Sequence, residues 1–256
     1  MTLCVENLTF SYKDRTVLEN VSFSVGRGSV TAVLGPNGVG KSTLFKCILG
    51  LLTDYKGKAT INGMETKNLA AEKLAGLAAY IPQSHDTAFN FSVFDMVLMG
   101  TTARLRGFRV PSDEQNEITL QALEQLNISF LKDRSYRRIS GGERQLVLIA
   151  RALAQKVGVM IMDEPTANLD YGNGLRVLNQ MRELADRGYT ILFSTHSPDQ
   201  AFLYADRVLA LADRKIMAFG APKETITADL IKKLYGVDVV VESLYDDRVR
   251  CCIPRL

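Results

Sequence analysis

A glycine-rich run over residues 35–42 constrains the fold of this chain more than any other feature of its sequence. It reads Gly-Pro-Asn-Gly-Val-Gly-Lys-Ser and fits the pattern G-x-x-x-x-G-K-[ST] at every fixed position. The run Val30–Leu34 before it is continuously β-prone, which is typical of a strand covered on both faces. The segment after it, from Lys41 to Leu52, has a helical pattern. Strand, glycine-rich turn and helix in this order are the context of a phosphate-binding loop.

The residue types in this run suit the chemistry of phosphate binding. Glycines allow consecutive backbone N–H groups to converge on phosphate oxygens, and the following helix adds the positive end of its dipole. Lys41 can reach the β- and γ-phosphates, and the hydroxyl of Ser42 can ligate Mg²⁺. An ordinary strand–helix turn is the alternative, and the complete motif in this context argues against it. The loop alone does not separate a kinase, a GTPase, a helicase and a transport ATPase.

Two adjacent acidic residues are of the type that binds the metal ion and activates the water in a nucleotide hydrolase. Asp163 and Glu164 directly follow the apolar run Val159–Met162, which has the character of a buried strand. An aspartate at the end of such a strand can point at Mg²⁺. The neighbouring glutamate can accept a proton from an attacking water or orient it. Solvated loop acids are the alternative, and the buried run before them makes that interpretation the weaker one.

Apolar runs and helical patterns alternate along much of the chain. The alternation of Val21–Val25, together with Leu3–Phe10, predicts a small antiparallel sheet at the N-terminus. The run Thr190–Phe193 has buried-strand character and follows a helical pattern, as the run before Asp163 does. Strands that alternate with helices predict an α/β core with a mainly parallel sheet.

The middle of the chain has a different pattern. Residues 85–154 show little strand signal apart from Phe89–Phe94, and apolar residues recur at helical spacing. This pattern predicts a helical insertion within the α/β core. Within it, Ser140 and Glu143 form S-x-x-E, a capping box that opens a helix. The glycines after Ser140 leave the start of that helix bare, so its N–H groups can approach an anion closely.

In this order, the motifs resemble those of the ATP-binding cassette (ABC) family, and the resemblance covers nearly the whole chain. Residues 35–42 match the Walker A loop, and Ser140–Gly142 match the signature motif. Asp163 and Glu164 match Walker B with its catalytic glutamate, Asn168–Asp170 match the D-loop, and His196 matches the switch histidine. A kinase or GTPase would leave the signature and the histidine unexplained.

The resemblance implies roles for single residues. Tyr12 lies where the family stacks an aromatic ring on adenine, and Gln83 matches a glutamine that touches the metal and responds to the membrane partner. The implied cofactors are ATP and Mg²⁺. The implied nucleotide-binding residues are Tyr12, Gly35, Pro36, Asn37, Gly38, Val39, Gly40, Lys41, Ser42, Thr43, Ser140, Gly141 and Gly142. The implied metal ligands are Ser42, Gln83 and Asp163, and the implied catalytic residues are Lys41, Gln83, Glu164 and His196.

The implied fold is an α/β P-loop NTPase of ABC type, with a mainly parallel core sheet, an N-terminal antiparallel β subdomain and a helical insertion. We expect one domain over residues 1–256, with a catalytic core of 1–84 and 155–256 and a helical subdomain of 85–154. The resemblance also implies a head-to-tail homodimer, in which the Walker A loop of one copy and the signature of the other enclose each ATP.

The net charge and the short apolar runs argue against a nucleic-acid-binding protein and a membrane-spanning protein. The 31 basic and 28 acidic residues leave a net charge of +3, which gives no reason to expect nucleic-acid binding. A membrane-spanning helix needs about 20 predominantly apolar residues, and the unbroken apolar runs here are far shorter. The N-terminus shows no signal-peptide pattern. We therefore expect a cytoplasmic protein with no membrane span of its own.

A cassette without a membrane span usually docks on separate membrane subunits, so the resemblance implies a place at the cytoplasmic face of the cell membrane. The implied partners are transmembrane permease subunits and, indirectly, a substrate-binding protein. Residues 91–100 and 234–239 are similar to the ATPases of iron-siderophore, haem and cobalamin importers. The function predicted is therefore ATP-driven uptake of a metal chelate. A zinc or manganese importer, an exporter and a soluble non-transport ABC ATPase stay open as alternatives.

Overall fold

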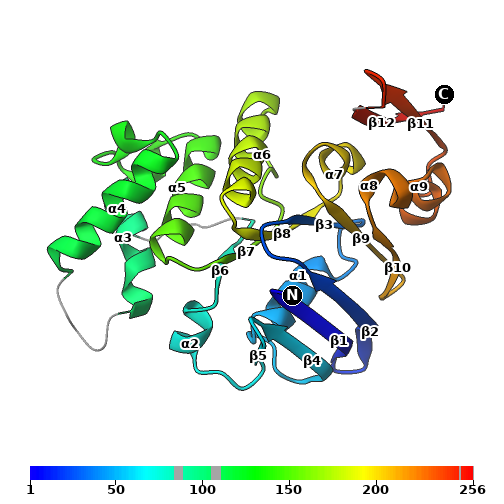
Figure 1. The fold of residues 1–256 in the computed structure, drawn as a ribbon, viewed down its shortest axis with the longest axis horizontal. Helices are drawn as coiled ribbons and strands as arrows, with labels where there is room; N and C mark the ends of the chain where they lie inside the picture. The colour runs from blue at the N-terminus through cyan, green and yellow to red at the C-terminus, as the bar shows by residue number, and fades with distance from the viewer. Residues whose placement is uncertain (84–88, 105–110, 248, 256) are drawn as a thin grey trace. The chain divides into compact units, whose positions relative to one another are not determined.

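The computed structural model describes every residue except 84–88, 105–110, 248 and 256 (Figure 1). The chain divides into two units, one made of Met1–Leu69 and Arg182–Leu256 and the other of Ala70–Met181. Each unit combines parallel strands with helices. The prediction of an α/β fold is therefore confirmed.

The first unit begins with the antiparallel sheet that the alternating pattern predicts. Its strands are β1 (Leu3–Tyr12), β2 (Arg15–Val25), β4 (Tyr55–Ile61) and the short β5 (Met64–Glu65), in the order β2-β1-β4-β5. The register places Val5 between Phe23 and Ala59 on its two neighbours, and all three are buried. One face of this sheet therefore carries the apolar set, as strand periodicity requires.

Parallel strands form the second layer of this unit. β3 (Val30–Leu34) pairs in parallel with β8 (Thr190–Thr195) and with β9 (Arg207–Ala212), and β10 (Lys215–Gly220) adds to β9 in the antiparallel sense. Every residue of β3 and β8 is buried. This complete burial is what a parallel strand covered on both faces shows.

Helix α1 (Lys41–Ile48) follows the glycine-rich turn, as predicted, but ends before Leu52. Gly50 adopts a left-handed φ of 63°, and the amides of Leu51 and Leu52 both donate to the carbonyl of Lys46. A left-handed glycine just past the last turn is a common way for a helix to end. The predicted end was therefore about one turn too late.

The C-terminal part of the first unit consists of short helices and a hairpin. They are α7 (Pro198–Tyr204), α8 (Pro222–Thr225), α9 (Ala228–Tyr235), β11 (Val239–Leu244) and β12 (Val249–Pro254). The carboxylate of Asp247 at the hairpin accepts hydrogen bonds from Arg250, Lys223 and Ser243, which hold its pKa well below the ordinary value. These bonds tie the hairpin to α8.

The second unit contains one parallel strand pair and a group of helices. The strands are β6 (Ala78–Ile81) and β7 (Val159–Met162). The helices are α2 (Ala71–Ala75), α3 (Val93–Leu98), η1 (Met99–Arg104), α4 (Asp113–Gln125), η2 (Ser129–Leu131), η3 (Tyr136–Arg138), α5 (Gly141–Ala154) and the first part of α6 (Tyr171–Asp186). Helices α3, α4 and α5 pack on one another (Figure 1). The helical character of this region agrees with the predicted insertion.

One local prediction was wrong. The strand expected at Phe89–Phe94 is absent from the described residues of that segment, because Ser92 caps α3. The hydroxyl of Ser92 accepts the amide of Asp95, and the carboxylate of Asp95 accepts the amide of Ser92. The subdomain boundary proposed at residues 84 and 85 falls outside the described residues, so it stays a prediction. Among the described helices, none has the length and apolarity needed to cross a bilayer.

Candidate functional site

The turn between β3 and α1 is fixed by two glycines. The amide of Gly35 donates to the carbonyl of Thr195 at 3.3 Å, which ties the turn to the end of β8. A Cβ at residue 35 would lie 2.4 Å from the carbonyl oxygen of Leu211, and one at Gly40 would lie 2.9 Å from Cγ1 of Val17. Gly40 also has a left-handed φ of 113°. Side chains at these two positions would therefore distort the turn.

Helix α1 begins with backbone N–H groups that no side chain caps. Its N-cap is Gly40, which offers no side-chain oxygen, and its first turn carries no acidic residue. The first N–H groups of a helix have no partner within the helix, and the helix dipole adds partial positive charge there. Ser42 in the first turn is exposed, and Thr43 is half-buried. This helix start is built to accept an anion such as a phosphate group.

The ammonium of Lys41 lies inside the turn. The residue is only 4% exposed, and its Nζ donates to the carbonyls of Gly35 at 2.8 Å and Pro36 at 3.0 Å. Burying a charge is costly unless hydrogen bonds compensate for the lost water, and these carbonyls supply them. The loop thus holds a positive charge beside the bare helix start.

His196 follows β8, the neighbour of β3. Leu34 and Thr195 are paired, so the phosphate loop and His196 leave the carboxyl ends of adjacent parallel strands. The hydroxyl of Thr195 donates to Gln200 at 2.8 Å and accepts the amide of Ser197 at 3.0 Å. These bonds fix the turn that carries the exposed His196. Ligands of α/β sheets bind at such strand ends.

Tyr12 ends β1 in the same unit. The residue is 47% exposed, and its ring packs edge-on against that of Phe10, with ring centroids 4.7 Å apart and planes at 88°. The packed edge holds the ring, and the exposed remainder could stack on a base. Its adenine-stacking role stays a prediction.

In the second unit, adjacent strand ends bring Gln83 and the two acids together. Ile81 pairs with Met162, and the amide of Asp163 donates to the carbonyl of Ile81 at 2.8 Å. The amide nitrogen of Gln83 donates to a carboxylate oxygen of Glu164 at 3.2 Å. The parallel pairing of β6 and β7 therefore places Gln83 beside the acids, although some 80 residues separate them in sequence.

The structure adds Tyr80, which the sequence analysis did not single out. Its hydroxyl lies 3.4 Å from a carboxylate oxygen of Asp163. Burial, together with the negative charge of Asp163, raises the pKa of Tyr80 to about 12, so the hydroxyl stays protonated and donates. No local pattern marks this tyrosine, because its partner lies on a strand far along the chain. Glu164 has a left-handed φ of 46°, a conformation that strains most residues by about 1 kcal/mol.

The capping box predicted at the start of α5 is confirmed. The Oγ of Ser140 accepts the amide of Glu143 at 3.2 Å, and the carboxylate of Glu143 accepts the amide of Ser140 at 2.8 Å. The bond from the backbone of Ser140 is the main cause that lowers the pKa of Glu143. Ser140 and Gly141 are exposed, whereas Gly142 is buried. The start of this helix is therefore ordered and accessible.

The residues predicted as metal ligands offer oxygen atoms of three kinds. Ser42 supplies a hydroxyl, Gln83 an amide oxygen and Asp163 a carboxylate, and Mg²⁺ prefers such hard oxygen donors. Across the part of the chain that the structure describes, no three His, Cys, Asp or Glu side chains form a group that could hold a metal ion. This donor set fits Mg²⁺, which a protein usually holds with one or two side chains together with substrate phosphates and water.

The predicted site residues fall into both units. Tyr12, the phosphate loop and His196 belong to the first unit, and the second contains Gln83, the acids and the start of α5. The structure brings His196 to the phosphate loop in the one and Gln83 to the acids in the other.

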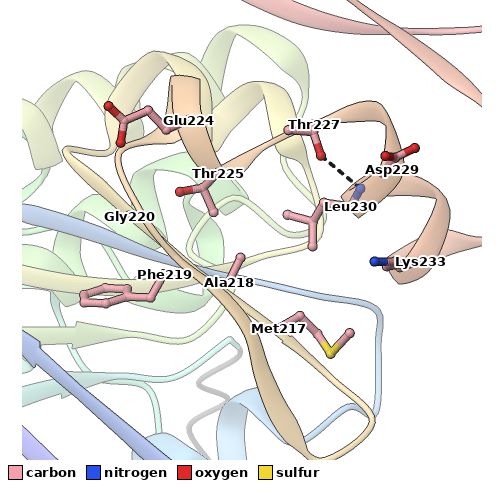
Figure 2. Close-up of a pocket in the computed structure, with 10 residues that line it drawn as sticks. All are labelled: Met217, Ala218, Phe219, Gly220, Glu224, Thr225, Thr227, Asp229, Leu230 and Lys233. Atoms are coloured by element: carbon pink, nitrogen blue, oxygen red, sulfur yellow. Dashed lines mark hydrogen bonds between the residues drawn. The ribbon is translucent and has the colours of Figure 1, made fainter.

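A pocket of about 510 Å³ lies elsewhere in the first unit, between β10, α8 and α9 (Figure 2). Figure 2 shows the lining residues Met217 and Phe219 on β10, and Glu224, Asp229 and Lys233 on the two helices. None of the predicted site residues lines it. Its two acids outnumber its one lysine, so the pocket is poorly suited to the phosphates of a nucleotide.

Known proteins are similar to this chain in sequence. The sequence profile of the ABC transporter family matches residues 18–167. The ferric enterobactin transport ATP-binding protein FepC of Escherichia coli is 35% identical, over 92% of this chain and 88% of its own. The manganese transport system ATP-binding protein MntA of Synechocystis is 34% identical, over 92% of this chain and 90% of its own.

A solved structure agrees over the whole length. It is a chain of an ABC transporter assigned to the metal-chelate type, in an inward-facing conformation. The two chains superpose with a TM-score of 0.89 at 31% identity, over 100% of this chain and 98% of the other.

Proposed function

Because this chain belongs to the ABC transporter family and is one of its nucleotide-binding, ATP-hydrolysing subunits, we propose that it drives the uptake of a metal chelate. The cargo class is that of iron-siderophore, haem and cobalamin complexes. The observation that carries this proposal is the match, over the full length, to a chain of the metal-chelate type. The similarity to FepC, a ferric enterobactin transport ATP-binding protein, supports the same class.

The nucleotide is ATP with Mg²⁺, held by the residues that the resemblance implies. The N–H groups at the start of α1 and the ammonium of Lys41 bind the phosphates, and Tyr12 stacks on the adenine. Ser42, Gln83 and Asp163 provide oxygen ligands for the ion. When bound, Mg²⁺ would neutralise negative charge on the phosphates. The uncapped start of α1 and the ammonium of Lys41 beside it support this assignment.

The chemistry follows from where charge and protons must go. Glu164 accepts a proton from the attacking water or orients that water. Lys41 stabilises the negative charge that spreads over the γ-phosphoryl oxygens in the transition state. His196 contacts the γ-phosphate from the adjacent strand end. The hydrogen bond from Gln83 to Glu164 supports a role for Gln83 in orienting that carboxylate.

The active form is a head-to-tail homodimer. The exposed start of α5, with Ser140 and Gly141, serves the nucleotide bound by a second copy. The backbone N–H groups of Gly141 and Gly142 and the helix dipole would add to the charge that holds the γ-phosphate. Dimer closure on ATP and opening after hydrolysis would then transmit work to the membrane partner.

The chain acts at the cytoplasmic face of the cell membrane, docked on transmembrane permease subunits. A substrate-binding protein delivers the chelate to those subunits. The family to which the chain belongs supports this assembly, and among the described residues no helix is suited to cross the bilayer itself.

Cargo competition in cells tests the proposal. A strain that lacks this chain should lose energy-dependent uptake of a radiolabelled ferric siderophore, and the intact chain should restore it, whereas Lys41→Ala should not. Manganese import is the second candidate, because MntA is a comparable relative. Loss of free Mn²⁺ uptake with intact chelate uptake would replace the metal-chelate proposal by that candidate.

A further inference from the structure

The start of α5 is in contact with the start of α6. A Cβ at Gly142 would lie 2.5 Å from Cγ and 2.7 Å from Oδ1 of Asn173, and one at Gly141 would lie 3.3 Å from Cδ2 of Leu169. Side-chain atoms do not approach one another to 2.5 Å. Gly142 therefore leaves the space that the amide group of Asn173 fills. All four residues belong to the second unit.

Asp170 holds the amide group of Asn173 in that space. Its Oδ2 accepts the side-chain Nδ2 of Asn173 at 2.7 Å, and its Oδ1 accepts the backbone amide of Asn173 at 2.9 Å. Because the Nδ2 group points at a carboxylate, the amide oxygen is the atom left to face Gly142. Asn173 thus touches the D-loop with one end of its amide and the signature glycine with the other.

We propose that Asn173 is a positioning residue that locks the signature start, Ser140–Gly142, to the D-loop residue Asp170 within one chain. The inference rests on the proposed head-to-tail dimer. Both segments then meet the second copy as one preformed surface, so binding does not have to order them separately. Preorganisation of this kind raises affinity by lowering the entropy lost on association.

The first test uses a parent protein carrying Glu164→Gln, in which ATP-dependent dimers should accumulate on size exclusion. Asn173→Asp keeps the shape of the side chain but replaces the Nδ2–H donor with a second carboxylate beside Asp170. The dimer dissociation constant in saturating ATP should rise about tenfold, the effect of losing a hydrogen bond to a charged group. ATP affinity of the monomer should stay the same, since Asn173 contacts no nucleotide in the proposed site.

A matched control and a rescue distinguish positioning from simple helix stability. Asn179→Asp makes the same change on an exposed position of α6 and should leave dimer formation at the parent level. Combining Asp170→Asn with Asn173→Asp exchanges donor and acceptor, so the bond is remade and dimer formation should return to near the parent level. Residue 170 retains a side-chain oxygen to accept the backbone amide of residue 173 in this exchange.

Three results would count against the inference. If Asn173→Asp dimerises like the parent, or if the exchange fails to restore the dimer, Asn173 does not act through Asp170 and the inference is wrong on its own. If the Glu164→Gln parent does not dimerise with ATP, the proposed homodimer fails and the inference falls with it.

Discussion

Glu164 is the residue on which the proposed chemistry depends most. Its backbone has a left-handed φ of 46°, and its carboxylate accepts a hydrogen bond from Gln83 at 3.2 Å. A strained backbone at such a position is typical of functional sites, where the surrounding structure enforces one side-chain direction. The direction of this carboxylate is therefore set by Gln83, just after β6, as well as by its own backbone.

Glu164→Gln should remove the proton acceptor without changing shape. We expect hydrolysis to fall by about 10²–10⁴-fold, the usual contribution of a general base, while ATP affinity is kept. Phosphate release and fluorescent-nucleotide titration measure the two quantities. Glu124→Gln, on an exposed position of α4, is the matched control and should hydrolyse ATP normally. A Glu164→Gln protein with normal turnover would remove Glu164 from the mechanism.

Cys47 gives a pH dependence that is independent of the nucleotide site. Its thiol is fully buried in α1, and burial raises its pKa to about 12. The unfolded chain releases this proton above about pH 9, whereas the folded chain keeps it. The contribution of Cys47 to the free energy of unfolding is therefore fully present below pH 9 and is lost as pH rises toward 12. The slope contributed by one proton is at most about 1.4 kcal/mol per pH unit. Denaturant unfolding between pH 7 and pH 10 should show a shallower decline for Cys47→Ala, and an equal decline would contradict this origin.

Elements, in contrast to single residues, were largely predictable when their signal was local. A sequence pattern of about ten residues is enough to predict the strand before the phosphate loop, the capping box at Ser140 and the N-terminal antiparallel strands. The strand expected at Phe89–Phe94 failed because the cap formed by Ser92 and Asp95 outweighs the β-propensity of the aromatic residues around it. Local hydrogen bonds of this kind compete directly with strand formation.

The close packing of η1 against α5 depends on a glycine in η1. A Cβ at Gly100 would lie 2.1 Å from the carbonyl oxygen of Arg151, so only glycine lets the two helices approach. Gly100→Ala should lower the free energy of unfolding by about 1–3 kcal/mol, as overpacking does. Gly158→Ala, where a Cβ would meet nothing within 4 Å, is the control and should be nearly neutral. Equal stability of the two variants in urea would contradict the contact.

At the scale of the whole molecule, the motifs predicted the fold class and the ABC family, and both are confirmed. The signal was strong because the phosphate loop, the signature and Walker B each need particular residues at fixed spacing. Contacts between distant segments could not be predicted in this way. Tyr80 reaches Asp163, and Asn173 fills the space beside Gly142, only because strands and helices far apart in sequence pack together.

The central claim is that ATP hydrolysis by this chain moves a metal chelate across a membrane. The direct measurement is chelate accumulation in proteoliposomes that contain the assembled permease, its substrate-binding protein and this chain, with ATP supplied on the side that the chain faces. The account predicts accumulation with the unaltered chain and none with Lys41→Ala or Glu164→Gln. Accumulation that persists with either variant, or hydrolysis by the intact assembly with no chelate moved, would contradict it.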